Sequence, residues 1–98
     1  MIIRIVKMTF EPEKVNEFLE IFNSSKLLIR NFEGCSHLEL LNDIKHSNTF
    51  FTYSYWQSEN ELNNYRNSEL FENVWAKTKI LFSSKPEAWS VIQQIVVE

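Results

Sequence analysis

The sequence of 98 residues contains one cysteine, one glycine and two prolines, and each scarcity excludes a class of protein. Cys35 stands alone, so no internal disulfide can form, which fits a reducing compartment better than secretion. A chain with a single glycine has no glycine-rich phosphate loop, and no Cys/His spacing typical of a metal site occurs. We therefore expect no cofactor and no bound metal.

The sequence also lacks a basic block and a long hydrophobic run. Ten Lys and Arg residues stand against thirteen Asp and Glu residues, for a formal net charge of −3. This balance does not suit a nucleic-acid-binding protein, so we expect no nucleic-acid partner. Residues 1–7 alternate and soon reach charged side chains, which fits neither a signal peptide nor a membrane span. We predict a cytoplasmic protein with no membrane contact.

What the sequence does contain is 44% hydrophobic residues, enough for one folded domain over residues 1–98. Residues 2–9 alternate with the period of a strand, and Pro12 suits the first turn of a helix that we expect to end near Arg30. Gly34 marks a position that needs either a positive φ or a close approach of another segment. Residues 35–44 and 49–56 then predict a β-hairpin.

The second half of the chain predicts a bent helical region followed by a final strand. Ser58 and Glu61 have the spacing of a capping box, which starts one helical piece. Ser68 is the expected N-cap of a second piece, whose apolar residues lie along one helical face. Residues 88–97 have strand character, with apolar residues on both sides.

The order strand, helix, strand, strand, helix, strand predicts an α+β, ferredoxin-like fold. Its four-stranded antiparallel sheet carries both helical regions on one face and leaves the other uncovered. The first, third and last strands have apolar residues on both sides, whereas a sheet with one wet face would alternate apolar and polar residues more cleanly. We therefore expect the uncovered face to pair with a second copy in a homodimer.

Several segments together resemble the antibiotic biosynthesis monooxygenase superfamily. They are the first strand with residues 10–14 and the following helix carrying Phe18 and Phe22, the strand ending in Tyr-Trp before a Ser-x-x-Glu helix start, and residues 68–71. The resemblance covers nearly the whole chain. It implies a dimeric α/β barrel, in which two such sheets pack face to face.

The resemblance also implies a range of chemistries. In the haem-degrading branch, an Asn, a Trp and an iron-ligating His take positions that fall here on Lys7, Tyr65 and Trp75, so none is retained and we expect no haem. Other members oxidise phenols without a cofactor. We therefore expect a small cofactor-independent monooxygenase acting on an aromatic, phenol- or quinone-like metabolite. The alternative is a non-catalytic dimeric module that binds a small hydrophobic molecule or serves a stress response.

Cofactor-free oxygenation needs a dry aromatic cavity, a proton acceptor and hydrogen-bond donors. The candidates for catalysis are Tyr65 and His37, and the candidates for binding the substrate are Phe71, Trp75, Tyr53 and Tyr55. Each also has a simpler structural explanation, because Trp75 with Phe71 can be helix core and His37 can be an ordinary strand residue. Arg4 and Lys7 lie on opposite sides of the first strand, so only one of them can face a cavity.

Overall fold

The chain forms four strands and three α-helices in the predicted order, and the computed structural model describes all of residues 1–98. The elements are β1 (Ile2–Thr9), a 3₁₀ turn (Pro12–Lys14), α1 (Val15–Arg30), β2 (Cys35–Asn42), β3 (Thr49–Trp56), α2 (Glu59–Arg66), α3 (Glu69–Lys79) and β4 (Glu87–Val91). This confirms the α+β, ferredoxin-like prediction. None of the helices combines the length and the apolar character needed to cross a membrane.

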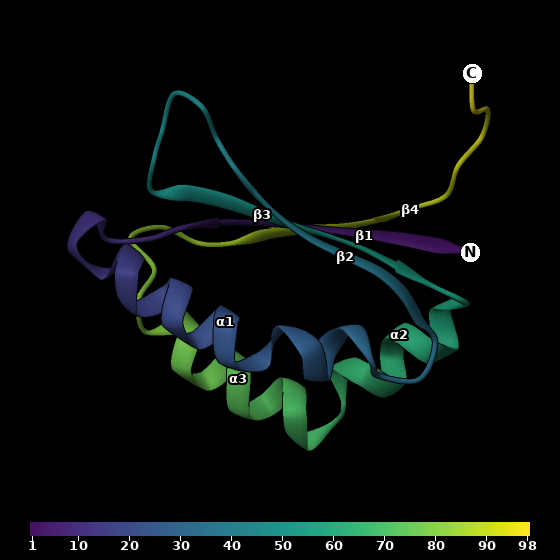
Figure 1. Ribbon diagram of the computed structural model, residues 1–98, viewed down its shortest axis with the longest axis horizontal. Helices are drawn as coiled ribbons and strands as arrows, with labels where there is room; N and C mark the ends of the chain where they lie inside the picture. Colours follow the sequence, from purple (N-terminus) through teal and green to yellow (C-terminus); the bar gives the residue numbers. More distant parts are fainter.

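The sheet has the strand order β2-β3-β1-β4, and every neighbouring pair is antiparallel. All three α-helices lie on one side of it, as Figure 1 shows, and no helix covers the other side. We call this uncovered side the open face. Its side chains come from alternate positions of the paired strands, including Ile3, Ile5, Tyr53, Tyr55 and Trp89.

The main core fills the space between one end of the sheet and α1. Phe10 is completely buried, and its ring stacks on that of Phe18 with centroids 4.1 Å apart. Met8, Phe50 and Leu81 complete this cluster. Because Phe18 belongs to the apolar stripe of α1, the same helical period that predicts the helix also fixes which side packs on the sheet.

The two short helices begin at the predicted serines. The Ser58 hydroxyl accepts a hydrogen bond from the Glu61 N–H at 3.3 Å, and the Ser68 hydroxyl accepts one from the Phe71 N–H at 3.1 Å. The second half of the predicted capping box is not formed, because the Glu61 carboxylate makes no hydrogen bond to the Ser58 N–H. The Glu61 side chain lies against Gly34 instead.

Gly34 meets both of the requirements that the sequence left open. Its φ is +91°, and a Cβ built on it would lie 2.5 Å from the Cβ of Glu61. Its carbonyl accepts a hydrogen bond from the Gln57 N–H at 2.8 Å, which joins the start of β2 to the end of β3. The turn therefore holds α2 close against the entry to β2.

Two predicted strands are shorter in the structure than in the prediction. The predicted segment 35–44 ends at Asn42, because Asp43 accepts backbone hydrogen bonds from Lys45 and His46 and turns the chain. The predicted strand 88–97 ends at Val91, which pairs with Ile3 near the beginning of β1. Residues 92–98 belong to no strand, and the chain turns away from the sheet there, near the N-terminus (Figure 1).

Candidate functional site

A cavity of about 270 Å³ lies between the helix-covered side of the sheet and the helices. Its floor is formed by alternate residues of two central strands, with Arg4, Val6 and Met8 from β1 and Thr52 and Ser54 from β3. The alternation of β1 therefore answers the question left by the sequence: Arg4 lines the cavity, and Lys7 points to the open face. A small, mostly apolar cavity with a few polar groups is the usual form of a small-molecule site.

One wall of the cavity is a continuous row of aromatic rings. Trp56 stacks on Tyr65 with centroids 4.8 Å apart, and Tyr65 contacts Phe71 edge to face at 5.2 Å. Phe71 in turn stacks on Trp75 at 5.7 Å. The Trp75 ring also meets that of Phe82 at 5.5 Å, outside the cavity lining. The row gives a planar aromatic ligand several faces and edges to pack against.

Tyr65 is a hydrogen-bond donor at neutral pH rather than a base. Burial, and to a smaller extent the nearby Cys35 sulfur, raises the pKa of Tyr65 well above its ordinary value. The hydroxyl therefore keeps its proton, and it has no hydrogen-bond partner within the protein. Since no fully buried side-chain oxygen or nitrogen lacks a partner, this hydroxyl is not completely enclosed by the protein.

Positive charge gathers at the end of the cavity where β1 begins and α2 ends. Arg4 and Arg66 both line this end, and neither forms an ion pair, since the one ion pair of the chain joins His37 to Glu39. Burial, and then the charge of Arg66, lower the pKa of Arg4. The guanidinium of Arg4 donates one hydrogen bond within the protein, to the Ser90 hydroxyl at 2.9 Å.

The six residues predicted as a site fall into two groups on opposite sides of the sheet. Tyr65, Phe71 and Trp75 line the cavity together. The other three lie on the open face, because His37 is the register partner of Tyr55 and Tyr53 alternates with the cavity residues Thr52 and Ser54. Their proposed roles remain predictions, but the four-stranded sheet separates the two groups within one chain.

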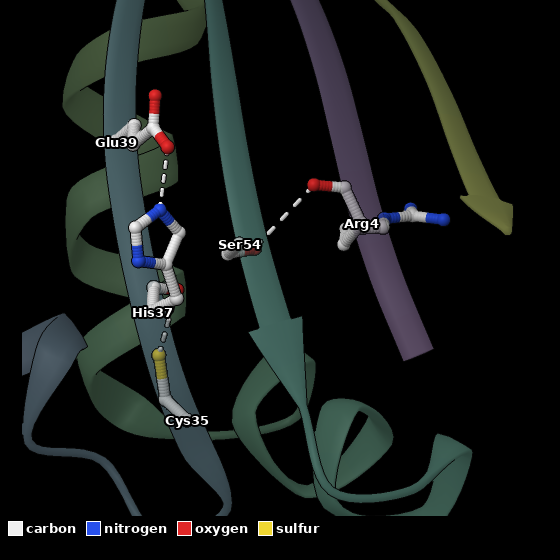
Figure 2. A network of polar contacts seen from close by, with 5 residues as sticks. All are labelled: Arg4, Cys35, His37, Glu39 and Ser54. Carbon is white, nitrogen blue, oxygen red and sulfur yellow. Dashed lines mark hydrogen bonds and ion pairs between the residues drawn. The ribbon is translucent and has the colours of Figure 1, made fainter. Parts of the chain in front are cut away.

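His37, Tyr53 and Tyr55 form a polar cluster with Glu39. His37 Nε2 lies 2.5 Å from the Glu39 carboxylate, and the imidazole packs on the Tyr55 ring with centroids 4.8 Å apart. The main cause that raises the pKa of Tyr53 is a hydrogen bond to the Tyr55 side chain, because it stabilises the protonated hydroxyl of Tyr53. Figure 2 views His37 and Glu39 on β2 with the helices behind the sheet, so these two side chains lie on the side away from the cavity.

Nothing in the sequence distinguished Arg4 from Lys7 as a cavity residue, and no sequence pattern pointed to Arg66. The signal for Arg4 is its place in the row Arg4, Val6 and Met8, but that row becomes the floor only when the helices cover it. As for metal ligands, no three His, Cys, Asp or Glu side chains converge anywhere in the chain. The polar side chains along the cavity carry guanidinium groups, hydroxyls, an indole and the single carboxylate of Glu87.

Comparison with known proteins assigns this chain to a protein family. The family model described as antibiotic biosynthesis monooxygenase matches residues 1–77, which run from β1 into α3. The chain belongs to this family. The resemblance noted in the sequence is thereby confirmed.

Solved structures of the same fold cover nearly the whole chain. A conserved protein from Methanosarcina mazei Go1 matches with a TM-score of 0.89 and 21% identity, covering 96% of this chain and 94% of that one. A structure described as an antibiotic biosynthesis monooxygenase matches with a TM-score of 0.89 and 16% identity, covering 95% and 98%. A Mycobacterium tuberculosis protein matches at 0.89 with 13% identity, covering 99% and 98%. No curated protein matches the chain.

At these identities, the similarity to the solved structures establishes the fold of this antibiotic biosynthesis monooxygenase family member. It does not establish a reaction or a substrate. A shared fold hosts many reactions, so the reaction must be argued from the cavity itself. The family model ends within α3, which leaves β4 and the cavity residues Pro86, Glu87 and Ala88 outside the match.

Proposed function

We propose that this chain is a small cofactor-independent monooxygenase that oxidises an aromatic, phenol- or quinone-like metabolite in the cavity. The observation that carries the proposal is the unpartnered hydroxyl of Tyr65 in an otherwise aromatic wall. A flat aromatic substrate packs against Phe71 and Trp75, and Tyr65 donates a hydrogen bond to the oxygen on which negative charge develops.

The reaction is balanced without any cofactor, because the substrate supplies all the electrons. A phenol and O₂ give a quinone and water. One oxygen atom becomes the new carbonyl, and the other leaves as water with the phenolic proton and the ring hydrogen that is replaced. Excluding bulk water from the cavity protects the reduced oxygen intermediates from side reactions.

Oxygen uptake tests this proposal directly. We expect uptake with at least one member of a panel of phenols and hydroquinones, and a loss of roughly a hundredfold in Tyr65→Phe, the size typical of removing one donor. Tyr53→Phe is the matched control, because Tyr53 lies on the open face, and it should leave the rate unchanged. No uptake above background with any compound would rule out the oxygenase.

A second candidate function is a non-catalytic module that binds a small hydrophobic or aromatic molecule. It is favoured by the absence of an imidazole from the cavity, since His37 lies on the far side of the sheet. Calorimetric binding of an aromatic compound without oxygen uptake or product formation would select this function. Both candidates use the same cavity.

We further propose that the open face packs against a second copy of the chain to form a homodimer. Trp89 is 43% exposed and Val91 41% exposed, although both belong to a strand of the central sheet, and Ile92 beyond them is 62% exposed. Apolar surface of this kind on a sheet usually marks a protein interface. Light scattering should give twice the chain mass, and Trp89→Glu should give the monomer. A wild-type monomer at micromolar concentration would contradict the dimer.

A further inference from the structure

The cations at the cavity end lack anions to balance them. Arg4 is partly buried and carries five N–H donors. It donates one hydrogen bond within the protein, to the neutral hydroxyl of Ser90. Arg66 makes no hydrogen bond or ion pair and adds a second positive charge at the same end. A partly desolvated guanidinium without a carboxylate partner is a ready site for an anionic oxygen, which it can bind through two parallel N–H donors.

The same cavity offers little that could remove a proton from a neutral substrate. Its titratable side chains are Arg4, Tyr65, Arg66 and Glu87. Tyr65 keeps its own proton because burial raises its pKa. Glu87 is the register partner of Lys7, so its carboxylate belongs to the open-face row and is exposed. A substrate that must be an anion therefore has to arrive as one.

We infer that the cavity takes a fused-ring aromatic ligand that is already ionised at neutral pH, and that Arg4, aided by Arg66, binds its charged oxygen. The inference rests on the proposed use of the cavity as the ligand site, but not on oxygenation. It narrows the ligand class to aromatic ring systems that carry an acidic group with an oxygen ionised at neutral pH. That oxygen belongs either to a carboxylate or to a hydroxyquinone.

The dimensions of the cavity agree with such a ligand. Arg4 and Met8 mark its ends along β1, and four residues of strand span about 13 Å. With the charged oxygen at Arg4, the rings lie over Val6 and reach toward Phe71 and Trp75. Two fused rings with one charged substituent fit this length.

Isothermal titration calorimetry with two matched pairs of compounds tests the inference. The pairs are 2-naphthoate with its alcohol 2-naphthalenemethanol, and 2-hydroxy-1,4-naphthoquinone with its neutral methyl ether. We expect the anion of at least one pair to bind tenfold or more tightly than its neutral partner, the range of a charge-assisted hydrogen bond. A preference within one pair alone identifies which source of the ionised oxygen the cavity favours.

Variants assign the preference to its residue. Arg4→Met keeps an apolar stem and should remove the preference for the anion, changing the affinity of the neutral partner less than about twofold. Arg4→Lys should retain part of it. Arg66 is exposed, so Arg66→Gln should not disturb the fold, and it should reduce the preference for the anion less than Arg4→Met does. Lys7→Met is the matched control on the other side of β1, and it should change nothing.

The indole signals in ¹H–¹⁵N correlation spectra locate the bound ligand. Trp56 and Trp75 line the cavity, whereas Trp89 lies on the open face, so the first two should shift on titration and the third should not. The inference would be overturned, with the proposed function left standing, if the anion and its neutral partner bound with equal affinity. It would also be overturned if Lys7→Met reduced the preference for the anion as much as Arg4→Met does. If no aromatic compound shifts the cavity indoles, the proposed use of the cavity fails and this inference fails with it.

Discussion

Replacing Gly34 with alanine should destabilise the fold for two separable reasons. The φ of +91° lies in the region that L-residues avoid, which costs about 1–2 kcal/mol. The new Cβ would also lie 2.5 Å from Glu61 Cβ and 2.8 Å from its Cγ, and such overpacking costs about 1–3 kcal/mol. Reduced freedom of the unfolded chain returns roughly 0.4–1 kcal/mol. The net loss should be roughly 1–5 kcal/mol.

Urea denaturation followed by circular dichroism measures this loss. For a domain of this size each kcal/mol lowers Tm by about 4–8 °C, so the melting temperature should fall by at least ~4 °C. The dependence of the unfolding free energy on urea concentration should not change, because the surface exposed on unfolding is nearly the same. Gly34→Ala within ~0.5 kcal/mol of wild type would refute the reasoning.

A double-mutant cycle separates the steric clash from the backbone strain. Glu61→Gly removes the Cβ that the new methyl would meet and by itself costs about 1 kcal/mol in helix propensity. The double variant should be more stable than the sum of the single effects by about 1–3 kcal/mol. A coupling energy of zero would show that the contact between Gly34 and Glu61 does not limit this turn.

Three further substitutions test the core, a helix start and the buried thiol. Phe10→Ala should lower the free energy of unfolding by about 3–5 kcal/mol in urea titrations, because Phe10 is fully buried and stacked on Phe18. Ser68→Ala should cost about 1 kcal/mol in the same assay through loss of the hydrogen bond from the Phe71 N–H. Burial raises the pKa of the Cys35 thiol, so the folded chain keeps a proton that the unfolded chain releases, and stability should fall as the pH rises through about 8.5. Cys35→Ala should remove that part of the slope between pH ~7 and ~9.5, and an unchanged slope would contradict the assignment.

Local signals were enough to predict most of the fold. The bounds of β1 and β3 coincide with the predicted strands, and both serine caps start helices where expected. The length of β4 could not be predicted in this way. Its sequence stays strand-like through Val97, but the strand ends at Val91, the partner of Ile3, because β1 begins only one residue before Ile3 and offers almost no further length to pair with. Pairing partners, rather than local propensity, decide where an edge strand stops.

The site was harder to predict because neighbouring residues of a strand point to opposite faces of the sheet. The aromatic residues Tyr53 and Tyr55 suit a cavity by composition, yet both belong to the row that faces away from the helices. Which row faces inward depends on where the helices pack, and a shift of one residue would exchange the two sets. The positions of Tyr65 and Trp75 did not depend on the strand register, because both residues lie on helices that cover the cavity.

The alternation of β1 also has a consequence for how this protein can change over evolutionary time. Arg4, Val6 and Met8 line the cavity, while Ile3 and Ile5 belong to the row on the open face, although all five lie within residues 3–8 of the chain. A point substitution at an even position changes what the cavity can hold and leaves the outer surface as it was. A substitution at an odd position does the reverse. Ligand preference and surface contacts can therefore diversify independently within one strand, whereas a single-residue insertion would alter both at once.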